Sequence, residues 1–68
     1  MFRGVVKWFD PKKGFGFIRE SSTENDLYVH FSAIVTNGHM ILFEGQEVSF
    51  EKRDTPSGIE AVNVRILS

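Results

Sequence analysis

Apolar and polar residues alternate with a period of two along most of the chain, as in short strands that bury one face. The pattern predicts five strands, over residues 5–10, 13–18, 27–31, 47–52 and 59–67. Proline, glycine and small polar residues mark turns or loops at 10–14, 21–25 and 54–58. No segment repeats its apolar residues at helical spacing over the length that a helix needs. The sequence therefore predicts an all-β fold.

The length of the chain favours closure of these strands into a barrel. Five strands in 68 residues would leave unpaired edges unless the sheet curls shut. We expect a single domain, residues 1–68, that forms a small five-stranded antiparallel Greek-key barrel of the OB-fold type.

The second predicted strand contains apolar side chains on both of its faces. Phe15 and Phe17 share one face, whereas Gly16 and Ile18 share the other. If Ile18 points into the core, the two rings face water and form a platform on which nucleobases can stack. The alternative is that both rings belong to the core and Ile18 lies at its rim.

The first strand poses a related question about its tryptophan. Val6 and Trp8 have the same parity, so strict alternation would bury both side chains. A β-bulge within residues 7–9 would turn the indole outward, but the period alone does not show whether a bulge exists.

The third strand alternates cleanly. Leu27 and Val29 are predicted to point inward, and Tyr28 and His30 outward beside Phe15 and Phe17. Phe31 has the parity of the core, although it ends the strand and could turn out. Residues 32–34 are typical of a single capped turn.

The remaining apolar positions predict most of the core. Val48 and Phe50 should point inward from the fourth strand, and three residues from the fifth: Val62, Val64 and Ile66. Residues 35–45 form a long loop, whose apolar middle, residues 40–43, is predicted to plug the end of the barrel rather than to bind a ligand.

Composition narrows the classes of function. The chain has no cysteine and two isolated histidines, so we expect no disulfide, no metal centre, no cofactor and no catalytic group. Its longest apolar run is too short to cross a bilayer, and we expect a cytoplasmic protein that does not bind membranes.

Charge is distributed unevenly along the chain. The net charge of −1 argues against binding nucleic acid mainly by neutralising phosphates. Residues 20–51, however, contain six acids and no lysine or arginine, whereas Asp10 is the one acid in residues 1–19. That first segment contains most of the exposed-ring candidates together with five basic residues: Arg3, Lys7, Lys12, Lys13 and Arg19.

Three motifs in this order and spacing resemble the bacterial cold-shock proteins, and the similarity extends over residues 4–64. The motifs are Lys7-Trp8-Phe9, Lys13-Gly14-Phe15-Gly16-Phe17-Ile18 and Val29-His30-Phe31-Ser32-Ala33-Ile34. The resemblance implies a barrel that binds single-stranded RNA and DNA, and we expect the bound strands to be pyrimidine-rich. It also implies the role of an RNA chaperone and, in some members of the family, of a transcription antiterminator.

The resemblance also implies which residues contact nucleic acid. The stacking positions of the family correspond to Trp8, Phe15, Phe17, Tyr28, His30 and Phe31, with Phe9 at the margin. Lys7, Lys13 and Asp26 match polar positions beside them. His39 stands where the loop of the family usually has a phenylalanine, and Asp10 replaces a common asparagine.

Two other classes of function remain as alternatives. An RNA-recognition motif also displays aromatic rings on adjacent strands, but it needs two helices that this pattern lacks. A barrel that grips a peptide or a sugar would not need lysines between its rings. We expect a monomer, with strand exchange between two copies through the loop 35–45 as the alternative.

Overall fold

The computed structural model describes residues 1–36, 38 and 40–67, and within these residues the chain forms five strands and one short 3-10 helix. The strands are β1 (Phe2–Asp10), β2 (Phe15–Glu20), β3 (Asp26–His30), β4 (Glu47–Thr55) and β5 (Gly58–Ile66), and the helix is η1 (Phe31–Ala33). In this part of the chain, no helix is long and apolar enough to span a membrane.

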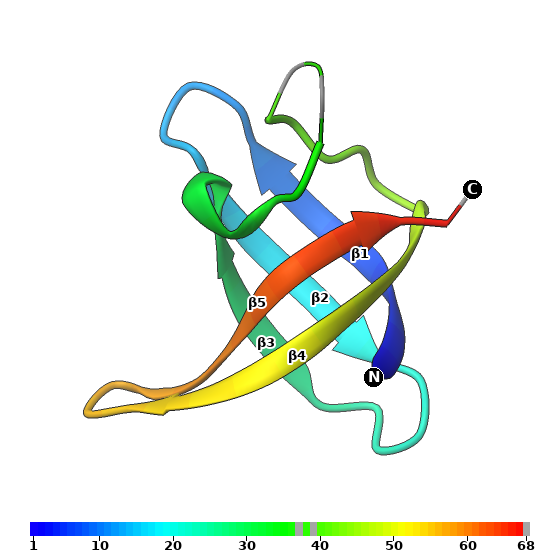
Figure 1. Cartoon of the computed structure of the whole chain (residues 1–68), viewed down its shortest axis with the longest axis vertical. Helices are drawn as coiled ribbons and strands as arrows, with labels where there is room; N and C mark the ends of the chain where they lie inside the picture. The colour runs from blue at the N-terminus through cyan, green and yellow to red at the C-terminus, as the bar shows by residue number, and fades with distance from the viewer. Residues whose placement is uncertain (37, 39, 68) are drawn as a thin grey trace.

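The strands close into a barrel in the order β1-β2-β3-β5-β4, with β4 paired to β1 (Figure 1). All of the strand pairs are antiparallel except β3 and β5, which meet in a short parallel contact between Tyr28 and Glu60. The predicted fold class is therefore confirmed. The parallel contact closes the barrel between two strands far apart in the sequence.

The core fills the inside of the barrel. Ile18 is fully buried, and so are Val29 and Val48. Phe15 and Phe17 lie on the outer face and are only half-buried, so the structure decides the question that the sequence left open. The core consists of Val6, Ile18, Leu27, Val29, Ile34, Leu42, Val48, Phe50, Ala61 and Val64.

A β-bulge at Lys7 determines the direction of the indole. Val6 pairs with Ile18 and Trp8 pairs with Phe17, so β1 has one residue more than β2 between these two pairs. The extra residue reverses the parity of β1, and Trp8 faces outward beside Phe17. A Cβ atom at Gly16 would collide with the carbonyl oxygen of Trp8, so only glycine permits this close approach of the two strands.

A second bulge corrects the prediction for the fifth strand. Ser49 pairs with Arg65 and Glu51 pairs with Val62, so β5 has an extra residue between these pairs. Asn63 has a positive φ of 51° within this bulge. As a result, Val64 is buried as predicted, but Val62 is only half-buried. Val62 pairs with the exposed Glu51, so its predicted inward direction is wrong. Ile66 pairs with the buried Val48, but it is the last residue of β5 and is 40% exposed, so its predicted burial in the core is wrong as well.

Smaller corrections concern the connections between strands. Strand β4 continues to Thr55, so its turn to β5 is shorter than predicted. The helix η1 begins at Phe31 and is capped by the side chain of His30 rather than by Ser32. In the loop, Leu42 is buried and contributes to the core, whereas Met40 and Phe43 are exposed, so the predicted plug is correct only in part.

One carboxylate is buried at the end of β2. Glu20 is 2% exposed, and its Oε1 atom lies 2.6 Å from the Lys52 ammonium of β4. The hydroxyls of Thr23 and Ser22 donate hydrogen bonds to the same carboxylate, at 3.0 and 3.3 Å. The hydrogen bond from Lys52 is the main cause of the lowered pKa of Glu20. This cluster ties the 21–25 loop and β4 to β2.

Candidate functional site

The outer surface of β1, β2 and β3 carries four aromatic rings in mutual contact. The ring centroid of Trp8 lies 5.5 Å from Phe15 and 5.8 Å from Phe17. Tyr28 lies 5.9 Å from Phe15 and 6.2 Å from Phe17. These distances lie in the range of favourable aromatic pairs, so the rings support one another while their outer parts remain open to water.

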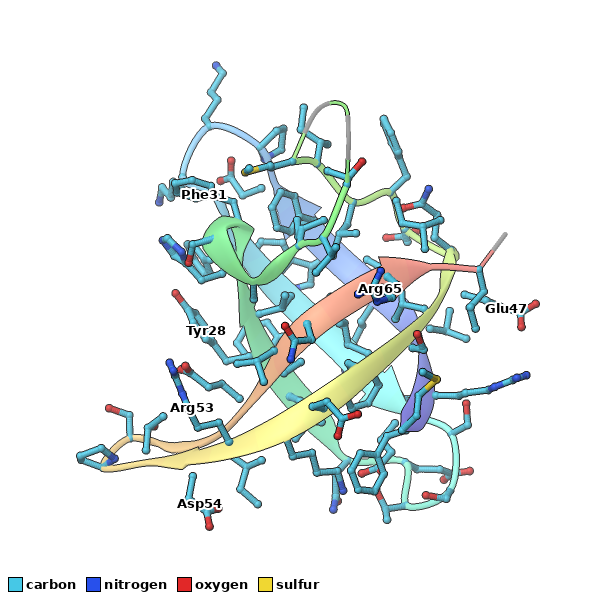
Figure 2. All side chains as sticks on the ribbon, viewed as in Figure 1. Tyr28, Phe31, Glu47, Arg53, Asp54 and Arg65 are labelled. Carbon is cyan, nitrogen blue, oxygen red and sulfur yellow. The ribbon has the colours of Figure 1, made fainter. Side chains whose placement is uncertain are left out.

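Two further rings extend this surface at the end of β3. His30 pairs in register with Phe15, and its ring centroid lies 4.4 Å from that of Phe31. We call these six side chains the aromatic face: Trp8, Phe15, Phe17, Tyr28, His30 and Phe31. Figure 2 shows Phe31 and Tyr28 projecting from the same edge of the barrel.

Local hydrogen bonds hold the last two rings in place. The Nδ1 atom of His30 accepts a hydrogen bond from the backbone N–H of Ser32 at 3.2 Å, and it lies 2.8 Å from the Ser32 hydroxyl. The N–H of Phe31 donates to the carbonyl of Gly14. A Cβ atom at Gly14, where φ is +75°, would lie 2.7 Å from the Phe31 ring. Glycine thus lets the ring lie directly over the turn between β1 and β2.

A charged cluster with one residue from each of β1, β2 and β3 borders the aromatic face. Asp26 lies 2.7 Å from the ammonium of Lys7 and 3.3 Å from Nε of Arg19. The hydrogen bond from Lys7 is the main cause of the lowered pKa of Asp26, and the one from Arg19 adds to it. Because one carboxylate faces two cations, the cluster as a whole remains positive.

The turn between β1 and β2 presents two more cations. The Asp10 carboxylate accepts hydrogen bonds from the backbone N–H groups of Lys12 and Lys13, at 2.9 and 3.2 Å. Asp10 therefore stabilises the turn, and the side chains of both lysines are exposed. Asp10, which stands where an asparagine is common in the similar proteins, therefore has a local structural role.

The structure brings together most of the residues that the sequence predicted for the site. The six members of the aromatic face share one surface, and Lys7 and Asp26 lie at its border, while Lys13 lies in the adjoining turn. Phe9 is not brought to this surface, because its half-buried ring packs against the core. The prediction for His39 lies outside the described residues.

Two residues next to the site were not expected from the sequence. Arg53 of β4 and Glu60 of β5 form an ion pair of 2.6 Å beside Tyr28. No local pattern indicates their position, because it depends on the contact between β3 and β5 that closes the barrel.

The family model described as the 'Cold-shock' DNA-binding domain matches residues 2–67. The chain belongs to this family. Membership implies nucleic-acid binding and a role of the cold-shock type, and it agrees with a surface made of rings and cations.

Curated relatives of this cold-shock domain cover it almost completely. The major cold shock protein of Streptococcus pyogenes serotype M1 is 51% identical over the full length of both chains. The cold shock-like protein CspC of Escherichia coli K12 is 53% identical over 91% of this chain and 90% of the relative. The cold shock-like protein CspJ of Salmonella typhi is 52% identical over 90% of this chain and 87% of the relative.

A solved structure shares the fold. The Drosophila structure titled Unr CSD456 superposes with a TM-score of 0.80 at 24% identity, over 98% of this chain and 26% of that chain. The likeness supports the closed barrel.

Proposed function

We propose that this cold-shock domain binds single-stranded RNA and DNA by stacking successive bases on the aromatic face. The observation that carries the proposal is that four outward rings on three strands form one connected surface beside a positive cluster. Paired bases are already stacked on each other inside a duplex, so rings of this kind discriminate in favour of single strands.

Stacking provides enough free energy for the proposed binding. Each stacked base contributes about 1–3 kcal/mol, so several occupied rings supply a large gross gain even after the strand has lost its conformational freedom. The cations add a smaller contribution. Lys12 and Lys13 are exposed in the turn, and Lys7 and Arg19 share Asp26. The cellular role that follows from such binding is that of an RNA chaperone, which keeps transcripts unpaired and so influences transcription.

The fluorescence of Trp8 provides a direct test, because it is the one tryptophan and it lies within the aromatic face. Titration with oligothymidine should change its emission and saturate, whereas the same bases held in a duplex should bind much more weakly. An exposed ring outside the aromatic face, Phe43, offers the control variant Phe43→Ala, which should bind as the unaltered protein does. Equal affinity for duplex and single strand would contradict the proposal.

A further inference from the structure

One row of paired residues crosses all five strands of the barrel. Trp8 pairs with Phe17, and Phe17 pairs with Tyr28. Tyr28 pairs with Glu60 across the parallel contact, and Glu60 pairs with Arg53. Because neighbouring strands lie about 4.8 Å apart, this row continues the aromatic face directly into the ion pair.

The ion pair leaves polar atoms available toward Tyr28. The Nη2 atom of Arg53 lies 2.6 Å from Oε1 of Glu60, and the side chains are 65% and 23% exposed. A carboxylate can accept about four hydrogen bonds and a guanidinium can donate five, so one contact uses a small part of either capacity. Arg53 fixes the direction of the Glu60 carboxylate.

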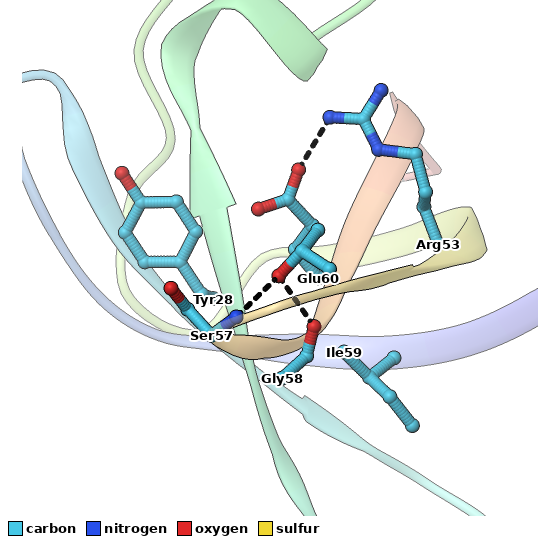
Figure 3. A pocket seen from close by; sticks show the side chains of 7 residues that line it. Tyr28, Arg53, Ser57, Gly58, Ile59 and Glu60 are labelled. Carbon is cyan, nitrogen blue, oxygen red and sulfur yellow. Dashed lines mark hydrogen bonds and ion pairs between the residues drawn. The ribbon is translucent and has the colours of Figure 1, made fainter.

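The ion pair also separates two hollows in the surface. One hollow, of about 500 Å³, is lined by Tyr28, Glu60, Arg53 and the turn between β4 and β5. The other, of about 240 Å³, includes His30 and Ser32 together with the same ion pair. Figure 3 shows Glu60 between the ring of Tyr28 and the guanidinium of Arg53. The larger hollow offers room for a purine beside the tyrosine.

We propose that Glu60 and Arg53 select guanine at the base position next to Tyr28. Among the four bases, guanine alone presents two adjacent donors, N1–H and N2–H, on its Watson–Crick edge, and both can bind one carboxylate. Its O6 atom accepts a hydrogen bond from an arginine. Glu60 is the register partner of Tyr28 and Arg53 lies one strand further, so the carboxylate meets the edge of such a base first.

This inference rests on the proposed function and adds base selectivity to it. Pyrimidines lack the paired donors, and adenine presents a single donor beside an acceptor. A bidentate contact with the correct base typically raises the affinity by about ten-fold over that for a wrong base. The domain would therefore prefer a strand with guanine at one position and tolerate any base at positions held by stacking alone.

The test uses oligothymidines of about seven nucleotides, a length within the range that such barrels bind. Guanine, adenine, cytosine or hypoxanthine replaces one thymine at each position in turn, and Trp8 fluorescence reports the affinity. At one position, guanine should bind about ten-fold more tightly than adenine or cytosine. The oligonucleotide with hypoxanthine, which lacks the N2 amino group, should bind with an affinity between those for guanine and for adenine. This part of the experiment uses the unaltered protein.

Two variants with the same change of charge complete the test. Glu60→Gln should lose the preference for guanine, whereas Glu47→Gln, an exposed acid at the start of β4, should keep it. The inference is overturned if no position favours guanine, or if Glu60→Gln retains the preference. A failure of plain oligothymidine to bind the unaltered protein would instead reject the proposed function itself.

Discussion

Strands β2 and β3 carry large apolar side chains on both faces, but only the inner face is sealed from water. Ile18, Leu27 and Val29 are buried inside the barrel. Phe17 and Tyr28, one residue away in the alternation, lie half-buried on the outside. The inner side chains stabilise the fold, whereas the outer rings retain apolar area that stays exposed to water.

The difference between the two faces shows how a small domain divides its aromatic residues. Phe50 is the one phenylalanine among the fully buried side chains of the described residues. Three other phenylalanines belong to the aromatic face together with the tryptophan and the tyrosine. The free domain therefore gives up some stability, because a small chain already buries a small share of its surface.

Removal of an inner side chain should have the largest effect. Ile18→Ala should lower the free energy of unfolding by about 2–5 kcal/mol, because it leaves a cavity in a closely packed core. Urea denaturation measures this loss. The fraction that remains folded should bind oligothymidine almost as the unaltered protein does, and a large loss of intrinsic affinity would show that the two faces are not independent.

Covering the outer face should have the opposite effect on stability. Oligothymidine at a hundred times its dissociation constant should raise the free energy of unfolding by about 2.7 kcal/mol. The melting temperature should then rise by several degrees. Thermal denaturation with and without the oligonucleotide measures the shift, with the same sequence as a duplex for the control. Saturated binding without a shift would contradict this expectation.

Salt should weaken binding only moderately if stacking dominates. Two to four neutralised phosphates give a slope of log K against log salt of about −1.5 to −3. Between 50 and 200 mM salt, the affinity should therefore fall by about 8- to 64-fold. A slope several times steeper would mean that cations rather than rings hold the strand.

Acid should distinguish the buried carboxylate from the one beside the aromatic face. The pKa of Glu20 is lowered from its usual 4.5, mainly by the hydrogen bond from Lys52. The ionised carboxylate therefore stabilises the folded state fully at pH values above 4.5. This stabilisation is lost as the pH falls through the lowered pKa. Urea denaturation at a series of pH values should show this loss of unfolding free energy. The free energy of unfolding should depend less on pH in Glu20→Gln than in Asp26→Asn.

The contrast between the two variants follows from burial. Glu20 is buried at the end of β2, whereas Asp26 lies at a surface where water screens its ion pairs. If both variants reduced the pH dependence of the unfolding free energy equally, this would contradict the structural role assigned to Glu20.

The alternation of residues predicted much of this architecture because it is a local property. The directions of Leu27 and Val29, and hence of Tyr28 between them, follow from the period of two. For Phe17 and Ile18 the period showed only that they point to opposite faces, and the structure shows that Ile18 is the buried one. The bulges do not follow from the period. The one at Lys7 turns Trp8 outward, and the one near Asn63 turns Val62 away from the core, because each adds a residue that the period does not reveal.

Contacts between distant segments were also beyond the sequence pattern. Lys52 reaches Glu20 from β4, and Glu60 meets Tyr28 only because β5 closes the barrel against β3. Each contact joins segments separated by about thirty residues, and the strand order decides which side chains face each other. Glu20 shares the parity of Ile18, which is a local signal of its burial, but it lies beyond the strand predicted over residues 13–18.

Two consecutive residues allow the most direct test of the central claim. Phe17 and Ile18 are neighbours in β2 that point to opposite faces. In Phe17→Ala, the affinity for oligothymidine should fall by about 1–3 kcal/mol. Its free energy of unfolding should fall by much less than in Ile18→Ala. Unchanged affinity in Phe17→Ala, together with a loss of stability as large as that of Ile18→Ala, would show that the ring belongs to the core and would contradict the account.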